Sequence, residues 1–581
     1  PSAVSAMRAS PLWLLLAVAG GARLPAVARP CIASRATPAT PPSDAARAVP
    51  RLRGGSSAVG SWVSILPPVV ALGASVALKQ VIIALLLGVW SGCLILAHGN
   101  PLLALMRTFD RYLVDAFNAP DHAGVLLFTF LLGGTIGVVQ KAGGGIALAR
   151  LLQTYMSTAR RALVCAWALC NLIFFDDYSS VLIVGNSIRP ALDELGAPAE
   201  RLGLIVHIMG VALTSLSPVS SWIGLQIGNV AAVYKQLELK TDPFVATMAS
   251  IPYRFLPVLL LLLVPILLAS GKDLGPMARY ALPEHPPARR AIHSAAEVEP
   301  SDEGPLAPKK GVPYRAMNAL LPFGTIALGT FGGMLYDGVA KIRAYPLERR
   351  PLINLVNVLS ASDSVNALVW SSAAGWLVSM GLVISQGVLS LDEAVQAWVE
   401  GMKDVLEPMF VLLLAWALGD VISHVQTADF LARALTDGLP RWSLPALVAV
   451  LAHVISYACG SSFGTMGIIL PLVGPLAHKL GGGDPAYLLH CIAAVLGGST
   501  FGNICSPISD TTILTVLATK CGMQAHIATI TPYALLCAGL ALMLGHVPVA
   551  LQWYGPLTGI ALSTITMVAI VGFFGNRPAS S

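Results

Sequence analysis

The sequence predicts an all-α polytopic membrane protein with about 11–14 transmembrane helices in two related halves. Of its 581 residues, 55% are hydrophobic and 11% are charged, and the mean hydropathy is +0.72. Soluble domains carry roughly 25% charged residues, so this composition excludes an ordinary soluble enzyme. Apolar stretches long enough to cross a bilayer recur along the chain. The clearest are residues 81–97, 125–139, 255–269, 409–422 and 534–549.

The charged residues indicate orientation rather than an acidic partner, although the net charge is +6. The loop from Lys141 to Arg161 also carries Arg150 and Arg160 and has no acid. Short basic loops stay on the cytoplasmic side, so this loop is expected on the cytoplasmic or stromal side. The nine cysteines include no CxxC pair, and most lie in apolar segments. Buried packing thiols are therefore expected rather than disulfides or a metal site.

The N-terminus has the pattern of targeting sequence. Residues 7–28 contain a basic start, a short apolar run and an Ala-x-Ala site, so residues 1–28 are predicted to include a signal peptide. Residues 29–61 are rich in Ala, Ser, Thr, Pro and Arg, with Asp44 as the single acid. This composition is typical of a transit peptide and is expected to lack a fold. The two signals together predict a plastid membrane of an alga; a secreted signal followed by a linker, with a plasma or endomembrane location, is the alternative.

The remaining chain divides into two membrane halves. We expect a first half at 62–271, an aqueous linker rich in proline and charge at 272–313, a second half at 314–575 and a tail at 576–581. Four phrases recur in the same order in both halves, which predicts a duplicated transport unit. They pair residues 131–134 with 415–419, 147–150 with 430–433, 178–180 with 460–462, and 217–221 with 506–510.

The last of these repeats carries the strongest functional signal. Residues 217–221 read SPVSS and residues 506–510 read SPISD, each inside apolar sequence. In lipid, prolines and hydroxyl clusters are tolerated only where they face protein or a water-filled cavity. Corresponding breaks in two halves indicate the binding site of a transporter. We therefore expect a helix break at Pro218, with Ser217 and Ser220 as ion ligands.

Asp176 and Asp177 are adjacent acids in an apolar context. A charged side chain at the centre of a transmembrane helix costs about 2.5–3.5 kcal/mol on insertion scales, so such residues are usually functional or paired. Two close carboxylates favour retention of one proton, as a proton carrier requires. The alternative is an interfacial loop with both acids solvated, since Asn186 and Pro190 indicate that the segment ends soon.

The second half offers a denser oxygen cluster in residues 502–512. Pro507 removes a backbone donor and Asp510 adds a negative charge. Oxygens of this kind suit Na⁺. The alternative, which is compatible with a site, is that Asp510 and the two threonines cap the next helix. The hydroxyl ligands expected here are Ser506, Ser509, Thr511 and Thr512, with Asn503 and Pro507 as supporting residues.

The other polar residues are less specific. The run that contains Gly460, Ser461, Ser462 and Thr465 predicts either a site or close helix packing. Asp363 is expected to cap the helix that follows it. Four histidines are treated as isolated core or interface residues, because they show no metal-ligand spacing. They are His207, His424, His490 and His526.

The chain has no Walker loop, no Rossmann glycine fingerprint and no hydrolase elbow. We therefore expect no cofactor and no enzymatic activity, and transport driven by ion gradients rather than by ATP.

Several phrases together resemble the NhaC-type Na⁺/H⁺ antiporter family, over about residues 62–549. They are residues 174–178, 184–190, 275–277, 414–417, 462–466 and 505–512. The resemblance implies two inverted repeats with broken helices or re-entrant hairpins, and Na⁺/H⁺ exchange. Many relatives carry Asp where this chain has Asn503. The family also includes members that move organic acids or amino acids.

The leading hypothesis is a secondary antiporter in which Asp177 or Asp176 carries the proton-coupled charge. Asp510, Ser506, Ser509 and Thr512 would complete the Na⁺ site with Asp177. The alternative is Na⁺- or H⁺-coupled transport of a small organic acid or amino acid, bound by half-helix N-termini at 217 and 506. The expected partners are Na⁺, H⁺ and the lipid bilayer, with no nucleic acid; a homodimer is compatible with this class.

The two halves are not equivalent in this reading. The second Ser-Pro phrase ends in Asp510 where the first ends in Ser221. Conversely, the first half has Asp176 and Asp177 where the second has Cys459 and Gly460. Each half is thus expected to contribute a different acid to one shared site.

Overall fold

The computed structural model describes residues 59–78, 80–153, 155–280, 304–346, 350, 352–435 and 440–576. Over these ranges the chain is helical, apart from one isolated β-bridge between Asp273 and Asn576. The all-α prediction is therefore confirmed for the described part of the chain. The predicted signal peptide and nearly all of the transit-peptide-like segment lie outside the described residues, as does most of the linker.

The first half contains α2 (Leu66–Leu78), α3 (Val81–Leu96), α4 (Pro101–Arg107), α5 (Val114–Asn118), α6 (Pro120–Lys141), α7 (Gly144–Gln153), α8 (Ala159–Leu172), α9 (Asp177–Glu194), α10 (Ala199–Leu216), α11 (Ile223–Gln236), α12 (Pro243–Ala249) and α13 (Phe255–Ser270). The second half contains α14 (Met317–Ala344), α15 (Leu355–Ala361), α16 (Ser364–Ser385), α17 (Leu391–Asp404), α18 (Leu406–His424), α19 (Thr427–Leu435), α20 (Leu444–Cys459), α21 (Ser462–Leu480), α22 (Pro485–Gly498), α23 (Thr500–Cys505), α24 (Asp510–Thr519), α25 (Met523–Leu540), α26 (Val547–Ala550) and α27 (Pro556–Phe574).

Ten helices of the described chain are long and apolar enough to cross a membrane, and the protein is an integral membrane protein. An eleventh span is formed if α12 and α13 are counted together, which a 57° bend separates. Two shorter apolar helices, α2 and α3, precede them. The number agrees with the lower end of the expected range, because several apolar segments are interrupted before they reach full length.

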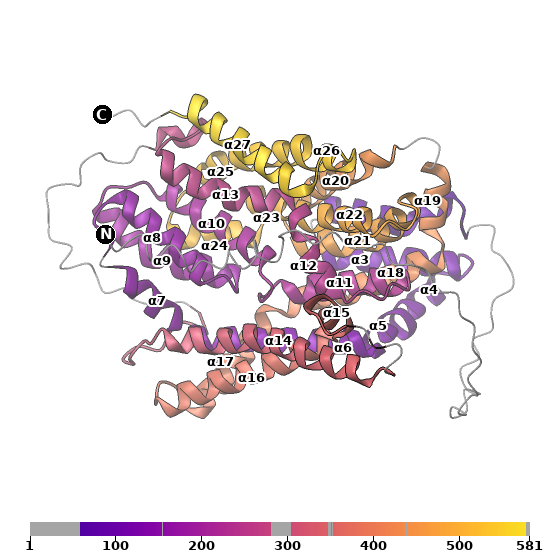
Figure 1. Cartoon of the computed structure of the whole chain (residues 1–581), viewed down its shortest axis with the longest axis horizontal. Coiled ribbons are helices and arrows are strands. Elements are labelled where there is room, and N and C mark those ends of the chain that lie inside the picture. Colours follow the sequence, from indigo (N-terminus) through magenta and orange to yellow (C-terminus); the bar gives the residue numbers. More distant parts are fainter. Residues whose placement is uncertain are drawn as a thin grey trace.

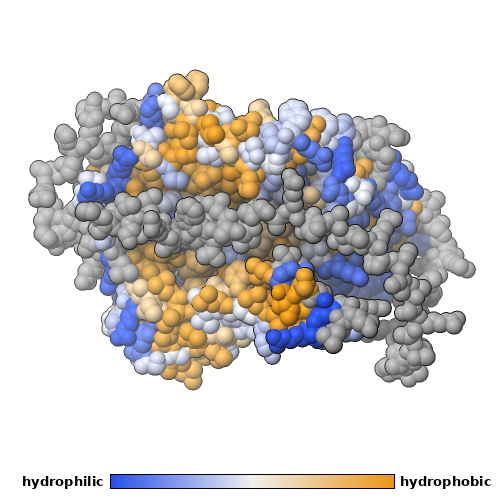
Figure 2. Space-filling model, viewed as in Figure 1, coloured by the Kyte–Doolittle hydropathy of each residue, from blue (hydrophilic) through white to orange (hydrophobic). Residues whose placement is uncertain are grey.

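Two layers make up the molecule (Figure 1). Helices α6, α14, α16 and α17 lie side by side along the lower edge of the view, and α6 packs against both α16 and α17. Helices α8, α9, α10, α11, α20, α21, α23 and α24 lie above this layer, together with α13, α25 and α27. Apolar side chains gather on the upper and lower parts of the surface in Figure 2. Leu328 on α14 and Phe573 on α27 are exposed, and a lipid environment accounts for exposed apolar side chains of this size.

Small residues allow α6 and α17 to approach closely. A Cβ atom added to Gly137 would overlap the carbonyl oxygen of Ala397, and one added to Gly401 would overlap that of Gly133. Glycine at helix contacts lets two backbones meet without side chains between them. This contact matters for the site, because α17 ends beside the helix breaks described below.

The end of the linker also folds against this layer. Lys309 forms a 2.7 Å ion pair with Glu393, which closes the capping box at the start of α17. The hydrogen bond from Lys309 holds the pKa of the Glu393 carboxyl at about 2. Lys141, at the end of α6, donates to the carbonyl of Pro305 at 3.0 Å. Residues 304–313 therefore connect α6 with α17 and are part of the folded structure.

We predict that Gly401→Val separates α6 from α17 and lowers the thermal unfolding midpoint of the detergent-purified protein. Overpacking of this kind costs about 1–3 kcal/mol. Gly381→Val on α16 is the matched control, because no atom lies within 4 Å of a Cβ added there. Equal midpoints for the two variants would contradict the close α6–α17 contact.

Candidate functional site

Besides the bend between α12 and α13, four helix breaks in the described part of the chain fall at or beside the paired polar phrases, two in each half. The breaks separate α8 from α9 (residues 173–176), α10 from α11 (217–222), α20 from α21 (460–461) and α23 from α24 (506–509). Two of them fall at the repeated Ser-Pro phrases, and the other two lie beside the paired segments 178–180 and 460–462. The broken helices predicted from the repeats are therefore confirmed, while the inverted relation of the halves stays a prediction.

The two breaks of the first half contact each other directly. The backbone N–H of Ser221 donates to the carbonyl of Phe175 at 2.8 Å. The indole Nε1 of Trp222 donates to Asp177 Oδ1 at 3.1 Å. Trp222 also packs edge-on against Phe463, at the start of α21, with ring centroids 4.9 Å apart. The first two breaks thus meet the third.

The two breaks of the second half are joined in a similar way. The backbone N–H of Ser462, the first residue of α21, donates to Asn503 Oδ1 at 3.0 Å. Gly460 has a left-handed φ of 68°, and a Cβ added there would lie 2.8 Å from Ile508 Cγ1. Glycine is therefore needed both for the turn that ends α20 and for the approach of residues 506–509.

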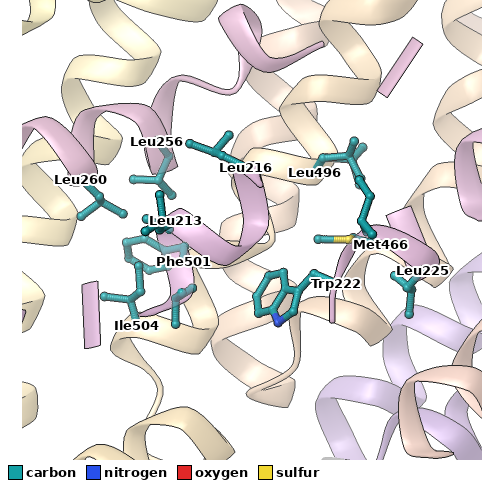
Figure 3. Packing of buried hydrophobic residues seen from close by; sticks show 14 of the residues in the cluster. Leu213, Leu216, Trp222, Leu225, Leu256, Leu260, Met466, Leu496, Phe501 and Ile504 are labelled. Atoms are coloured by element: carbon teal, nitrogen blue, oxygen red, sulfur yellow. The ribbon is translucent and has the colours of Figure 1, made fainter. Parts of the chain in front are cut away.

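Apolar packing holds the ends of these helices. Figure 3 shows Trp222 beside Met466, and a second group contributed by the end of α10, by α13 and by α23. The labelled residues of this second group are Leu213, Leu256, Leu260, Phe501 and Ile504. The breaks are therefore fixed in an apolar interior, where each freed backbone group needs a partner.

In the first Ser-Pro phrase, local side chains supply that partner. Pro218 has no N–H to donate to the carbonyl of Thr214, and Ser220 Oγ donates to it instead at 2.9 Å. Ser217 Oγ donates to the carbonyl of Val219 at 2.9 Å. Both predicted ion ligands of the first half thus use their hydroxyl protons on the backbone of the break.

A buried arginine satisfies the same end of α10. Arg254 is 1% exposed, and its Nη1 donates to the carbonyl of Ser215 at 2.9 Å and to Gln226 Oε1 at 2.8 Å. Its other nitrogens donate to Ser250 Oγ and to the carbonyl of Thr247. A guanidinium at the negative end of the α10 dipole is favourable, and it repels a second cation from this break.

In the second Ser-Pro phrase, the partner comes from a distant helix. Pro507 deprives the carbonyl of Asn503 of its usual donor. His207 Nε2, on α10, lies 2.8 Å from this carbonyl oxygen, and Thr512 Oγ1 donates to it at 3.3 Å. Ser506 Oγ is fully buried and has no hydrogen-bond partner among the described residues. This break therefore retains an uncommitted oxygen.

The paired acids of the first half have different surroundings. Asp176 is the N-cap of α9, and its Oδ2 accepts from Ser179 N at 2.8 Å and from Ser179 Oγ at 2.5 Å. Asp177 begins α9, is 2% exposed and accepts from Trp222. With Asp176 only 7% exposed, the alternative of two solvated acids is wrong.

Asp510 begins α24 and reaches back to the first half. Its Oδ1 accepts from Thr511 N at 2.7 Å, and its Oδ2 accepts from the hydroxyl of Tyr178. Ser509 is the N-cap by position, and its Oγ lies 3.4 Å from Asp510 Oδ1. Asp510 thus supports the start of the helix and contacts the first half of the chain at the same time.

The hydroxyl of Thr511 lies between the acids of the two halves. Its Oγ1 is 3.4 Å from Asp177 Oδ2 and 3.3 Å from Asp510 Oδ1. A threonine hydroxyl has one proton to donate, so it serves one carboxylate at a time. The other carboxylate then needs a proton or a cation.

A cavity with an empty volume of about 380 Å³ opens onto the acids of the first half, whereas Asp510 is exposed and does not line it. Asp176 and Asp177 line it, with Tyr178, Trp222 and Phe463, and α6 and the corner between α17 and α18 close the other side. Among the described residues that line it, none is Lys, Arg or His. The cavity is therefore suited to a cation.

The sequence reasoning missed Asp404, which also lines this cavity. Asp404 ends α17, where part of its side chain is exposed to solvent. Burial of the remainder, followed by the charge of Asp176, raises the pKa of the Asp404 carboxyl to about 6. No local pattern points to this residue, because α17 has the pattern of an amphipathic surface helix.

Other predicted residues are placed outside the carboxylate cluster. Ser461 is the N-cap of α21, and Thr465 Oγ1 donates to its carbonyl at 2.8 Å. Asn186 lies roughly 13 Å further along α9 than Asp177, at 1.5 Å per residue. Asp363 caps α16, as expected, and accepts from Asn366 N at 3.1 Å.

The prediction that four histidines are isolated is wrong. His207 Nδ1 lies 2.8 Å from His526 Nε2, and His490 Nε2 lies 3.1 Å from His546 Nδ1. His424 Nδ1 is 3.0 Å from the hydroxyl of Tyr112. The partners are far away in sequence, so spacing could not reveal them. No group of three or more His, Cys, Asp or Glu suited to a metal ion occurs in the described chain.

Comparisons with known proteins agree with this architecture. The profile of the Na⁺/H⁺ antiporter family matches residues 213–547. An uncharacterized protein of Haemophilus influenzae is 26% identical over 514 residues, which cover 87% of this chain and 94% of that protein. The malate-2H⁺/Na⁺-lactate antiporter of Bacillus subtilis is 30% identical over 153 residues, or 26% of this chain and 31% of that protein.

A solved structure is similar in fold. MtrF of Neisseria gonorrhoeae, described as illuminating a class of antimetabolite efflux pumps, has a TM-score of 0.54 at 14% sequence identity. The match covers 87% of this chain and 96% of that one. The two chains therefore share a fold, and the family profile independently supports a membrane transporter.

The position of Asp404 generates a prediction about pH. Because the folded protein retains this proton up to about pH 6 and an unfolded chain releases it near 4, stability falls as pH rises through this interval. We expect Asp404→Asn to flatten this fall in the thermal midpoint between pH 4 and 7. Asp392→Asn, on the same helix outside the cavity, is the control; identical profiles for the wild type and Asp404→Asn would contradict the raised pKa.

Proposed function

The chain belongs to the Na⁺/H⁺ antiporter family, and we propose that it is a secondary active antiporter that exchanges Na⁺ for H⁺ by alternating access. The exchange draws on ion gradients and requires no ATP hydrolysis. The proposal is supported by the contacts of Thr511 with one acid from each half, and by the adjoining cavity, which Asp176, Asp177 and Asp404 line and whose described lining includes no basic side chain.

The sharing of Thr511 is the observation that carries this proposal. Asp177 comes from the first half and Asp510 from the second, yet both lie within 3.4 Å of the same hydroxyl oxygen. Since one hydroxyl proton serves one carboxylate, the pair lacks one positive partner. A Na⁺ ion or an H⁺ meets that requirement equally well in charge. The two ions therefore compete for the same acids, which enforces exchange.

The proposed Na⁺ ligands are oxygens of the α23–α24 break together with Asp177. Ser506 Oγ has no hydrogen-bond partner among the described residues and is available as a ligand. Thr512 Oγ1 donates its proton to Asn503 and keeps lone pairs for a cation. The first Ser-Pro phrase is a poorer location, because Arg254 is held against that end of α10. The remaining ligands in this proposal are Asp510 and Ser509.

The position of the acids on their helices supports cation binding further. Asp176 and Asp177 begin α9, and Asp510 begins α24, so each lies at the positive end of a helix dipole. Helix N-termini stabilise carboxylates in their charged form, which is the form that binds a cation.

Exchange or cotransport of a small organic acid is the second candidate function. The match to the malate-2H⁺/Na⁺-lactate antiporter over 153 residues is the observation that favours it. A substrate carboxylate would bind at a half-helix N-terminus, but Asp176 and Asp510 already accept the N–H groups at the starts of α9 and α24. The cavity favours the cation, and the organic anion is the alternative.

We also propose a plastid membrane as the location, which rests on the composition of residues 7–28 and 29–61 alone. A homodimer is the proposed assembly by analogy with transporters of this class. Neither proposal affects the chemistry of the site.

Reconstitution decides between the two functions. We expect an imposed Na⁺ gradient to drive a pH change inside proteoliposomes that carry a pH dye, with no organic solute present. An impermeant cation of equal concentration is the ionic-strength control. Proton movement that appears only after addition of an organic acid or amino acid would overturn the Na⁺/H⁺ proposal.

Substitution of the paired acids assigns the charge carrier. We expect Asp177→Asn to lower the initial exchange rate at least 100-fold, because it removes the carboxylate that faces Thr511. Asp176→Asn should retain most of the rate, because asparagine caps a helix about as well as aspartate. Rates are compared per amount of reconstituted protein, with Asp363→Asn as a capping control. Full exchange in both Asp177→Asn and Asp176→Asn would contradict the assignment.

A further inference from the structure

A chain of two histidines and one backbone carbonyl joins three helices beside the α23–α24 break. His207 on α10 and His526 on α25 are both fully buried, and their rings stack with centroids 5.1 Å apart. His207 Nδ1 is 2.8 Å from His526 Nε2, and His207 Nε2 is 2.8 Å from the carbonyl oxygen of Asn503. The proposed exchange does not use either ring.

The hydrogen bonds determine the tautomer of each ring. A carbonyl oxygen only accepts, so His207 carries its proton on Nε2. With both rings neutral, as their burial favours, His207 Nδ1 is an acceptor and His526 Nε2 is its donor. His526 Nδ1 is then the unprotonated nitrogen, and it has no hydrogen-bond partner among the described residues. Gly203 leaves room for this nitrogen, since a Cβ there would lie 3.0 Å from it.

The carbonyl that His207 contacts is the one that Pro507 leaves without a helical donor. The side chain of the same residue, Asn503, accepts from Ser462 N at the start of α21 and lies 3.5 Å from Thr511 Oγ1. Asn503 therefore connects the third break with the hydroxyl shared by the acids. The orientation of this residue bears on the geometry of the whole cluster.

We propose that His207 is a positioning residue, which holds Asn503 and the α23–α24 break in the geometry that the ion site needs, and that His526 fixes its tautomer. The first half solves the equivalent problem locally, since Ser220 donates to the carbonyl that Pro218 frees. The α23–α24 break instead depends on α10, the helix whose C-terminal end begins the α10–α11 break. The two broken helices are thereby coupled through one side chain. The transport consequences rest on the proposed function, whereas the structural consequences do not.

Two measurements on the full-length protein test this proposal. One is the KM and kcat for Na⁺ in proteoliposomes, and the other is deuterium uptake of backbone amides in residues 503–515. We expect His207→Leu to raise KM about tenfold and to speed uptake in this segment, because a buried carbonyl loses its donor. His207→Gln should recover most of both properties, since its amide retains an N–H. The matched control is His490→Leu, which removes a histidine from the other buried pair and should change neither.

The outcomes separate the proposals. Wild-type KM and uptake in His207→Leu would overturn the positioning role, and so would equal losses in the Leu, Gln and His490 variants, which would indicate packing alone. If His207→Leu does not fold, His526→Leu tests the proposal instead. This variant keeps the His207 ring and removes only the His526 ring that orients it. Unchanged deuterium uptake in residues 503–515 of His526→Leu would contradict the proposal. If the wild type shows no Na⁺-driven proton movement, the proposed function fails, while the deuterium uptake still decides the role of His207.

Discussion

The need to satisfy backbone groups freed at helix breaks is the constraint on which the rest of this structure depends. No water is available in a bilayer core to hydrogen-bond an exposed N–H or C=O, so every interruption of a helix requires a partner from the protein. The four breaks at the polar phrases provide hydrogen-bond partners for one another. Ser221 donates to Phe175 between the first two, and Asn503 accepts from Ser462 between the last two. A site with many fixed polar groups is the consequence.

The partners recruited at the two Ser-Pro phrases make the breaks electrostatically different. Arg254 donates to a carbonyl near the end of α10, which gives the α10–α11 break a positive charge. At the α23–α24 break, the neutral ring of His207 donates to the carbonyl of Asn503. The helix that follows this break, α24, begins with Asp510. A cation is therefore attracted toward the α23–α24 break and toward Asp177. Two copies of one phrase thus contribute in different ways to one site.

Much of the site could be read from the sequence, because charged residues in apolar surroundings are rare enough to be informative. Asp177 and Asp510 are residues of this kind. Pro218 and Pro507 are informative for a related reason, because they interrupt helices inside apolar sequence. The prediction that each half supplies a different acid agrees with the contacts that both acids make with Thr511. The helix break at Pro218 predicts Ser217 and Ser220 as ion ligands, but their hydroxyls donate to the local backbone. The sequence does not distinguish a serine that binds an ion from one that replaces a missing backbone donor.

The sequence by itself determined the membrane class and the positions of the Ser-Pro breaks, since hydropathy and proline act locally. Only the tertiary structure decided which residues meet. The indole of Trp222, the guanidinium of Arg254 and the ring of His207 reach partners that lie far away in the sequence or in other helices. Asp404 joins the cavity because glycines let α17 pack closely on α6. Contacts of this kind depend on how helices pack, and packing depends on the shapes of many side chains at once rather than on any local pattern.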